Sequence, residues 1–371
     1  MTWRWRLGAL AAFVLLAACS SPVATGAPST PTAAASDSPA AEPSPTDDAA
    51  TASPSPSEAA TAEPAAPASW AGLEATGPIG REDHTWTVDP NGETAYLFGG
   101  RDRATVFGDL WAYDLATDSW SELAASGGPE PRFGHEAVWL EGTGLVVFAG
   151  QAGSSFFNDL WTYEPATATW TQLPSSGAIP TARYGSCAAI GPDGRLWISH
   201  GFTSEGSRFH DTVVYDFEAG AWTDETPDAP RPVDRCLHGC WWTDAGELAL
   251  FGGQTTGVIA LGDLWLLRDG AWVRVDGALP PDRNLYARAR VGAATLVFGG
   301  QAVDKSYLGD AFLLIDGEAD AVALDVTGPA PRAGSEMIAD PARDRVLLFG
   351  GRDAAQAFDD LWELRGALPA G

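Results

Sequence analysis

The sequence is organised around one recurring unit, which is clearest between residues 96 and 120. An apolar run ends in Gly99 and Gly100, and a polar loop leads to a second apolar segment that opens with Asp109. A single tryptophan, Trp120, follows. The second position of the glycine pair recurs 47 to 52 residues apart, at Gly100, Gly150, Gly201, Gly253, Gly300 and Gly351. Self-similarity at this period predicts an array of equivalent supersecondary units.

Two charged residues keep a fixed place in every unit. An arginine precedes the glycine pair by 17 to 19 residues, at Arg81, Arg132, Arg183, Arg235, Arg283 and Arg332. An aspartate opens the next segment, at Asp109, Asp159, Asp211, Asp263, Asp310 and Asp360. Because both residues recur in all units, we interpret them as pairs that pin loops locally rather than as a ligand-binding crown. The apolar residue two positions before each aspartate is interpreted as part of a repeated core.

The segments within a unit have the character of short β-strands. Residues 137–139, 145–148, 160–163 and 169–173 are rich in β-branched and aromatic side chains. Turn sequences such as Asp89-Pro90-Asn91-Gly92 separate the first two segments of their units. Each glycine pair suits a place where the backbone packs closely or adopts a positive φ.

The recurring glycine pair, aspartate and tryptophan resemble kelch repeats, in which each unit is one four-stranded blade of a β-propeller. The resemblance covers about residues 70–366 and implies an all-β, six-bladed propeller. The last unit contains Asp360-Leu361-Trp362, but residues 363–371 include no further tryptophan that would correspond to Trp120. Residues 70–73 resemble residues 120–123 and lie 50 positions before them. We therefore expect the N-terminal strand to complete the last blade and close the ring.

The N-terminal 69 residues read as an export signal and a tether. Arg4 and Arg6 precede an apolar run, and Leu16-Ala17-Ala18-Cys19 resembles a bacterial lipobox, whose cysteine is lipidated. An ordinary secretory signal is the alternative. Residues 20–69 are almost entirely Ala, Pro, Ser, Thr, Asp and Glu, a composition typical of a disordered tether. The domains expected are thus 1–19, 20–69 and the propeller at 70–371, held at the extracytoplasmic side of the cell membrane.

The charge of the chain excludes two classes of partner. The formal net charge is −27, and the propeller alone keeps −23 when Arg4, Arg6 and the six acidic residues of the tether are left out. A surface this acidic repels nucleic acid and anionic lipid headgroups. We expect no nucleic-acid partner, and membrane contact only through the lipid anchor.

Three cysteines lie in the propeller, namely Cys187, Cys236 and Cys240. Counted from the repeated arginine, Cys187 is at position four of its unit and Cys240 is at position five of the next. The two cysteines therefore lie at nearly the same depth along the first strands of neighbouring blades. Because one position is even and the other odd, their side chains can face one another. This predicts a bridge between Cys187 and Cys240 with Cys236 free, and it depends on which parity faces the preceding blade. A Cys187–Cys236 bridge and the absence of any bridge remain the alternatives. A Cys236–Cys240 bridge is disfavoured because four strand residues span about 13 Å.

A metal site is the sharper hypothesis for the same region. Cys236, His238 and Cys240 alternate along one strand, with His200 and His210 in the preceding blade, and such ligands bind zinc or copper. However, His84 and His135 occupy the same repeat position as His238 without any cysteine beside them. We therefore interpret this histidine as structural, and we expect neither a metal nor a cofactor.

Candidate binding residues lie where the repeat is broken. The loops between the second and third strands open on one face, and aromatic rings beside polar donors suit a sugar ring or a peptide end. The residues of these loops that the blades do not share are Arg101, Arg103, Phe156, Arg208, His210, Lys305 and Tyr307.

Relatives in kelch-like families imply three functional classes. Galactose-oxidase-like enzymes use a copper site of tyrosines and histidines, and no such set is found here. Plant specifier proteins hold iron with Glu-x3-Asp-x3-His, and Asp234-x3-His238 matches only two of these three residues. Bacterial sialic-acid epimerases resemble this chain in having six blades, but no catalytic residues can be transferred from them. The third class is a binding module for a protein or glycan. We expect this class, as a monomer, with a carbohydrate-active enzyme as the alternative.

Overall fold

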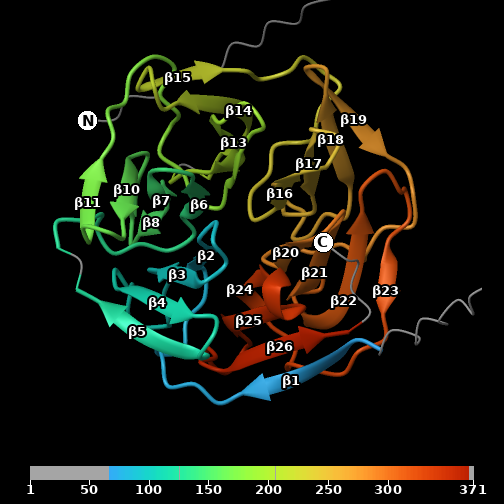
Figure 1. Cartoon of the computed structure of the whole chain (residues 1–371). Helices are drawn as coiled ribbons and strands as arrows, with labels where there is room; N and C mark the ends of the chain where they lie inside the picture. The colour runs from blue at the N-terminus through green and yellow to red at the C-terminus, as the bar shows by residue number, and fades with distance from the viewer. Residues whose placement is uncertain (1–66, 125, 205, 367–371) are drawn as a thin grey trace, which may run out of the picture. The chain divides into compact units, whose positions relative to one another are not determined.

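The computed structural model describes residues 67–124, 126–204 and 206–366. Six four-stranded antiparallel sheets are arranged around a central axis, with their first strands innermost (Figure 1). The prediction of an all-β, six-bladed propeller is thereby confirmed. The expected signal, Cys19 and all but the last three residues of the expected tether lie outside the described residues.

The first three blades follow the chain in order. Blade one contains β2 (Thr85–Val88), β3 (Thr94–Phe98), β4 (Leu110–Asp114) and β5 (Ser119–Leu123). Blade two contains β6 (Glu136–Leu140), β7 (Gly144–Phe148), β10 (Leu160–Glu164) and β11 (Thr169–Gln172), and the short hairpin of β8 (Gln151–Ala152) and β9 (Ser155–Phe156) extends from it. Blade three contains β12 (Cys187–Ile190), β13 (Leu196–Phe202), β14 (Arg208–Asp216) and β15 (Ala221–Asp224).

The remaining blades include the one that joins the two ends of the domain. Blade four contains β16 (Gly239–Trp242), β17 (Leu248–Phe251), β18 (Leu264–Arg268) and β19 (Ala271–Val275). Blade five contains β20 (Ala287–Val291), β21 (Ala294–Gln301), β22 (Tyr307–Ile315) and β23 (Val322–Leu324). Blade six contains β24 (Ala333–Asp340), a 3-10 turn η1 (Pro341–Arg343), β25 (Arg345–Arg352), β26 (Leu361–Arg365) and β1 (Ser69–Leu73).

The N-terminal strand closes the ring as the sequence predicted. β1 runs antiparallel to β26, with Ser69 opposite Arg365 and Leu73 opposite Leu361. In Figure 1 the blue β1 lies along the outer edge of the red β26. Trp70 is buried in the core between blades five and six. The pairing fills the outermost strand position of blade six, which the C-terminal part of the chain leaves open.

The repeated arginine and aspartate form a bidentate ion pair in every blade. Arg81, for example, is fully buried and donates to both carboxylate oxygens of Asp109 at 2.7 and 2.8 Å, and to the Gly99 carbonyl at 2.8 Å. Its guanidinium also lies over the ring of Phe107. These contacts tie the start of the first strand to the loop between the second and third strands. The interpretation of the pairs as local pins is confirmed.

The glycine pairs adopt the positive φ expected of them. In blade one, φ is 62° at Gly99 and 92° at Gly100. Ala149 and His200 occupy the first position of the pair in blades two and three, and they have φ of 62° and 59°. This left-handed conformation is costly for residues with a Cβ atom, so the tertiary structure of the blade imposes it.

A closed ring of six backbone hydrogen bonds surrounds the propeller axis. One left-handed residue per blade, two positions after the repeated arginine, donates its N–H to the equivalent carbonyl of the preceding blade at 2.7 to 3.2 Å. The residues are Asp83, Gly134, Gly185, Leu237, Leu285 and Gly334. The ring binds neighbouring blades to one another and narrows the central channel at this end. We call this end the loop face, because the loops between second and third strands also lie there.

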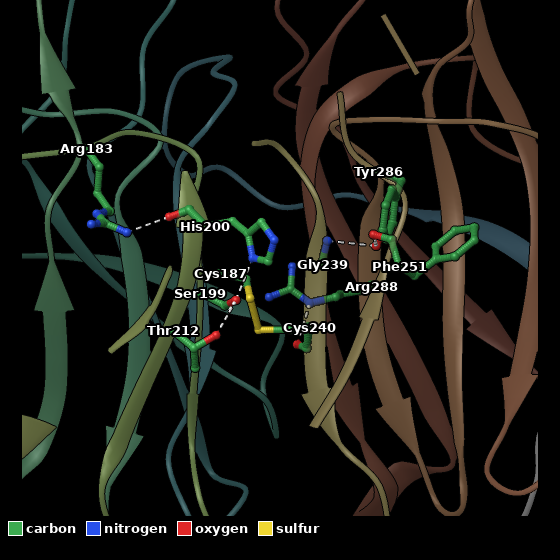
Figure 2. The surroundings of a disulfide bond; sticks show 10 residues. All are labelled: Arg183, Cys187, Ser199, His200, Thr212, Gly239, Cys240, Phe251, Tyr286 and Arg288. Carbon is green, nitrogen blue, oxygen red and sulfur yellow. Dashed lines mark hydrogen bonds between the residues drawn. A yellow bond between two sulfur atoms is a disulfide. The ribbon is translucent and has the colours of Figure 1, made fainter. Parts of the chain in front are cut away.

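One disulfide joins blades three and four. Cys187 of β12 and Cys240 of β16 are bonded, with their Cα atoms 5.7 Å apart, which is the pair expected from the sequence (Figure 2). Cys236 is free and buried. Positions along the first strand are counted here from the repeated arginine of each blade. The imidazole of His135, at position three of blade two, lies 2.9 Å from the hydroxyl of Thr85 in blade one, so odd positions face the preceding blade. Cys240 is at position five of its blade and faces blade three, whereas Cys187 is at position four and faces blade four.

Candidate functional site

Three of the seven candidate residues lie together on the loop face. Arg101, Arg103 and Tyr307 line a cavity of about 350 Å³ that Glu82 and Arg352 also line. These five residues come from blades one, five and six, and we call them the arginine cleft. The cleft therefore lies beside the blade that the N-terminal strand completes.

Glu82 is the centre of the contacts inside the arginine cleft. Arg352 donates to its carboxylate and to the hydroxyl of Tyr307, and the guanidinium of Arg101 lies 3.3 Å from the same carboxylate. The side chain of Glu82 is only 9% exposed. Burial, together with the neighbouring Asp83 carboxylate, raises the pKa of Glu82 to about 7, although both arginines oppose the shift. Glu82 thus changes its charge near neutral pH.

Arg101 links the cleft to the hydrogen-bonded ring around the axis. It donates to a carboxylate oxygen of Asp83 at 3.0 Å, and the hydroxyl of Tyr184 in blade three donates to the same oxygen at 3.3 Å. The guanidinium also lies 4.0 Å from the centre of the Phe133 ring in blade two. Arg101 is therefore held rigidly, and it is part of the scaffold of the cleft as well as of its surface.

Two similar turns form the rim of the cleft. The carboxylate of Asp102 accepts backbone hydrogen bonds at 2.7 and 2.6 Å from the residues that follow it, and Asp353 accepts two at 2.7 and 2.8 Å. Arg103 from the first turn donates to the backbone carbonyl of Ala354 in the second. The carboxylates of Asp102 and Asp353 are thus engaged by the backbone of their own turns. In the described part of the chain, no carboxylate is hydrogen-bonded to Arg103.

Phe156 and Arg208 lie in a second cluster, over blades two to four. The ring of Phe156 packs 5.9 Å from that of Phe202, and the guanidinium of Arg208 lies 5.4 Å from the Phe202 ring. Arg208 also donates to the hydroxyl of Thr256 at 3.2 Å. None of these residues lines the arginine cleft.

His210 and Lys305 lie in neither cluster. The Nδ1 atom of His210 is 2.9 Å from a carboxylate oxygen of Asp234, and Arg231 donates to its Nε2 atom at 3.1 Å. Because Nε2 accepts, Nδ1 donates to Asp234. Lys305 is exposed at the turn between β21 and β22, with φ of 68°. The structure therefore unites only three of the seven candidates.

The sequence analysis missed Glu82 and Arg352. Glu82 follows the repeated arginine directly, and six different residues occupy this position in the six blades. Arg352 follows the last glycine pair, where blades one and six have arginine and blades two, four and five have glutamine. Arg101 occupies the same position in blade one, so the criterion that selected Arg101 would also have found Arg352 if applied to blade six. Glu82 would have been found by including the variable position after the repeated arginine.

The arginine cleft offers hydrogen-bond donors to a polar ligand. Three guanidinium groups and one phenol surround the carboxyl of Glu82, whose pKa burial raises to about 7, and turns form the rim of the cleft. Such a site is suited to carboxylate, amide or hydroxyl groups. Within residues 67–124, 126–204 and 206–366, no group of three or more His, Cys, Asp or Glu side chains is arranged to hold a metal ion. None of the helical segments in these residues has the length and apolarity needed to cross a membrane.

The blades, their ion pairs and the loop-face cleft define a propeller of the kelch class. Residues 65–253 match the family model described as the KLHDC2/KLHL20/DRC7 Kelch-repeats domain, which is about half of the chain. The chain belongs to this kelch-repeat family, whose propellers commonly serve as protein-binding modules. It is also similar to the dynein alpha chain of the flagellar outer arm from Chlamydomonas reinhardtii, at 30% identity over 198 residues. That match covers 43% of this chain and 4% of the dynein chain, so the relative is far longer.

Proposed function

We propose that this propeller is a binding module that holds a peptide or glycan ligand in the arginine cleft. The observation that carries the proposal is the convergence of Arg101, Arg103, Tyr307, Glu82 and Arg352 from three blades on one cavity. A repeat architecture provides the same scaffold in every blade, and specificity comes from the loop residues that differ. The cavity is about 350 Å³, which fits one or two residues of a peptide or one sugar ring.

The experiment is a thermal-shift screen of the purified chain against peptides with acidic or amide ends and against glycans. A ligand at 100 times its dissociation constant adds about 2.7 kcal/mol to the stability of the folded state. We expect at least one ligand class to raise the melting temperature. The absence of a shift from every peptide and glycan would count against a cleft for either class.

A second candidate function is acid–base chemistry on a sugar. The observation that favours it is Glu82, because a buried carboxyl with a pKa of about 7 beside guanidinium groups is suited to proton transfer. An enzyme would turn over an epimerisable or oxidisable sugar and would lose that turnover in Glu82→Gln. A binding module would show a shift in melting temperature without turnover.

We further propose that the propeller is tethered to the extracytoplasmic side of a membrane. The Leu16-Ala17-Ala18-Cys19 motif and the composition of residues 20–69 support this, and a disulfide in the propeller is consistent with an oxidising compartment. Fractionation of cells that express the wild type and Cys19→Ser tests the anchor. We expect the wild type in the membrane fraction and the variant either released or unprocessed. Identical fractionation of the two would contradict lipidation.

A further inference from the structure

The central channel of the propeller is a second cavity, separate from the arginine cleft. Near the loop face it is narrow, about 100 Å³, and the hydrogen-bonded ring of backbone forms its end. Toward the opposite face it widens to about 540 Å³. The two sections have Trp86, Thr87, Ala137, Arg288 and Glu336 in common, so they are consecutive parts of one channel that is wider away from the loop face.

The narrow section contains an unbalanced set of charges. Asp83, Glu136 of β6 and Glu336 of β24 line it, and Arg288 of β20 is the only basic side chain among its described lining residues apart from histidines. The Nε atom of Arg288 donates to the Cys240 carbonyl at 3.3 Å (Figure 2). No side chain among the described residues forms a hydrogen bond or an ion pair with either glutamate, although the backbone of Ala188 hydrogen-bonds to Glu136. Asp83 is paired with Arg101 at 3.0 Å, so Glu136 and Glu336 share the single guanidinium of Arg288. Ionisation of both glutamates would leave one negative charge without a partner.

Buried polar atoms around the glutamates also lack partners. Within the described chain, the hydroxyls of Ser186 and Ser335 and both ring nitrogens of His84 and His238 make no hydrogen bond, and all four side chains are at least 95% buried. All four residues line the narrow section. Groups of this kind are normally satisfied, so their clustering at one cavity indicates a site that accommodates a polar guest.

The wide section is largely apolar and aromatic. Trp86, Trp139, Trp241 and Trp242 line it together with aliphatic residues of other first strands. Arg288 and Arg290 also line it, and Arg290 pairs with Asp316 at 2.9 Å. Indole faces attract cations and cover apolar groups. The channel therefore changes from an aromatic entrance to an acidic end along its length.

We propose that the channel binds a small organic ammonium ion, with its charged group between Glu136 and Glu336 and its apolar part against the tryptophans of the wide section. The ammonium supplies the positive charge that the two carboxylates and Arg288 lack. Its N–H groups satisfy the carboxylates and the unpartnered hydroxyls. The strongly acidic surface of the protein raises the local concentration of cations outside the entrance.

The ionisation of the two channel glutamates agrees with this assignment. Burial raises the pKa of Glu136 to about 8 and that of Glu336 to about 7, and Arg288 opposes both shifts. Near neutral pH, protons bound to Glu136 and Glu336 therefore neutralise the charge that Arg288 does not balance. An ammonium ion that replaces such a proton releases it to the solvent.

The test is isothermal titration of the full chain at neutral pH with two matched probes. Phenethylammonium carries the charge and an aromatic body, whereas 2-phenylethanol has the same body without the charge. We expect the ammonium to bind, at least about tenfold more tightly than the alcohol, with net proton release that is visible as different heats in buffers of different ionisation enthalpy.

Four single variants and one double variant locate the site. Glu136→Gln and Glu336→Gln keep the side-chain shape and should each weaken phenethylammonium binding about tenfold or more, while melting curves verify that they fold. Glu122→Gln, exposed on β5, and Arg103→Ala, on the arginine cleft, should leave the affinity unchanged. Equal binding of the alcohol, full binding to a Glu136→Gln/Glu336→Gln double variant, or no binding of the ammonium at millimolar concentration would overturn the proposal.

Discussion

Trp70, in the first described strand of the chain, packs its indole ring 5.4 Å from the ring of Phe298 in blade five. The same residue pairs with Leu364 in the β1–β26 ladder of blade six. One side chain thus connects the N-terminal strand, the C-terminal strand and the neighbouring blade. This contact makes the closure of the ring accessible to measurement.

We predict that Trp70→Ala destabilises the whole propeller. Trp70 is 9% exposed, and the loss of a buried tryptophan leaves a cavity that costs about 3 to 5 kcal/mol. Val322→Ala is the matched control, because Val322 lies in β23, the outermost strand of blade five, and is 45% exposed. Deletion of residues 66–76 should have an even larger effect than Trp70→Ala, and deletion of residues 20–60 should have none. Equal melting temperatures for the two deletions would show that β1 does not close the ring.

The buried ion pairs predict a second set of stabilities. Asp159→Ala leaves the fully buried guanidinium of Arg132 without the carboxylate that lies 2.7 Å from it, which costs about 3 to 5 kcal/mol. The exposed pair of Arg274 and Asp276 is the control, and Asp276→Ala should change the stability by less than about 1 kcal/mol. Chemical denaturation of the two variants measures both values. Similar small losses in both would contradict the pinning role of the repeated pairs.

The disulfide predicts a defined pattern of thiols. Non-reducing peptide mapping should give a linked Cys187–Cys240 peptide and a single alkylated residue, Cys236, after unfolding. The bridge closes a loop of 53 residues, so a Cys187→Ser/Cys240→Ser variant should lose about 2 to 4 kcal/mol. Three alkylated thiols in the propeller of the unreduced protein would refute the bridge.

Stability should fall as the pH rises from about 5 to about 8.5. The pKa values of Glu136 and Glu336 are raised in the folded protein, to about 8 and about 7, so the folded state binds more protons than the unfolded chain in this range. Their contribution is present at low pH and is lost as the pH passes through the raised values. The charges that act on them are Arg288, Asp83 and each other. Burial keeps the pKa of His84 and His135 well below the usual range, which favours their neutral form.

The size of this pH effect can be measured by thermal melting. We expect the melting temperature of the wild type to be about 5 °C or more higher at pH 5.5 than at pH 8.5. The Glu136→Gln/Glu336→Gln double variant should show a smaller difference, with Glu82 accounting for what remains. A double variant with the full wild-type slope would assign the pH dependence to other groups.

The repeat made the fold predictable, because every blade has the same sequence pattern. The repeat period identifies the six blades through Gly100 and its five equivalents, and the similarity of residues 70–73 to residues 120–123 identifies the closing strand. The backbone ring through Asp83 and Gly334 had no such signal, because it consists of N–H and carbonyl groups that every sequence has.

The candidate site was predictable only in part. Arg101, Arg103 and Tyr307 were found as loop residues that the blades do not share. Their convergence depends on which loops of blades one, five and six lean together, and the sequence of a single blade does not contain this information. Lys305 has the same signal in the sequence, but its turn holds it apart from the cleft.

The central proposal is that the arginine cleft binds the ligand, and two substitutions in the cleft test it with little risk to the fold. Arg103→Ala removes a rim cation, and Tyr307→Phe removes only a hydroxyl. Arg208→Ala, in the cluster over blades two to four, is the matched control.

The decisive measurement is the shift in melting temperature that each peptide or glycan ligand causes in the wild type and in these three variants. We predict that ligands that stabilise the wild type lose most of their effect in Arg103→Ala and Tyr307→Phe and keep it in Arg208→Ala. Undiminished shifts in both cleft variants, or a loss confined to Arg208→Ala, would contradict the account.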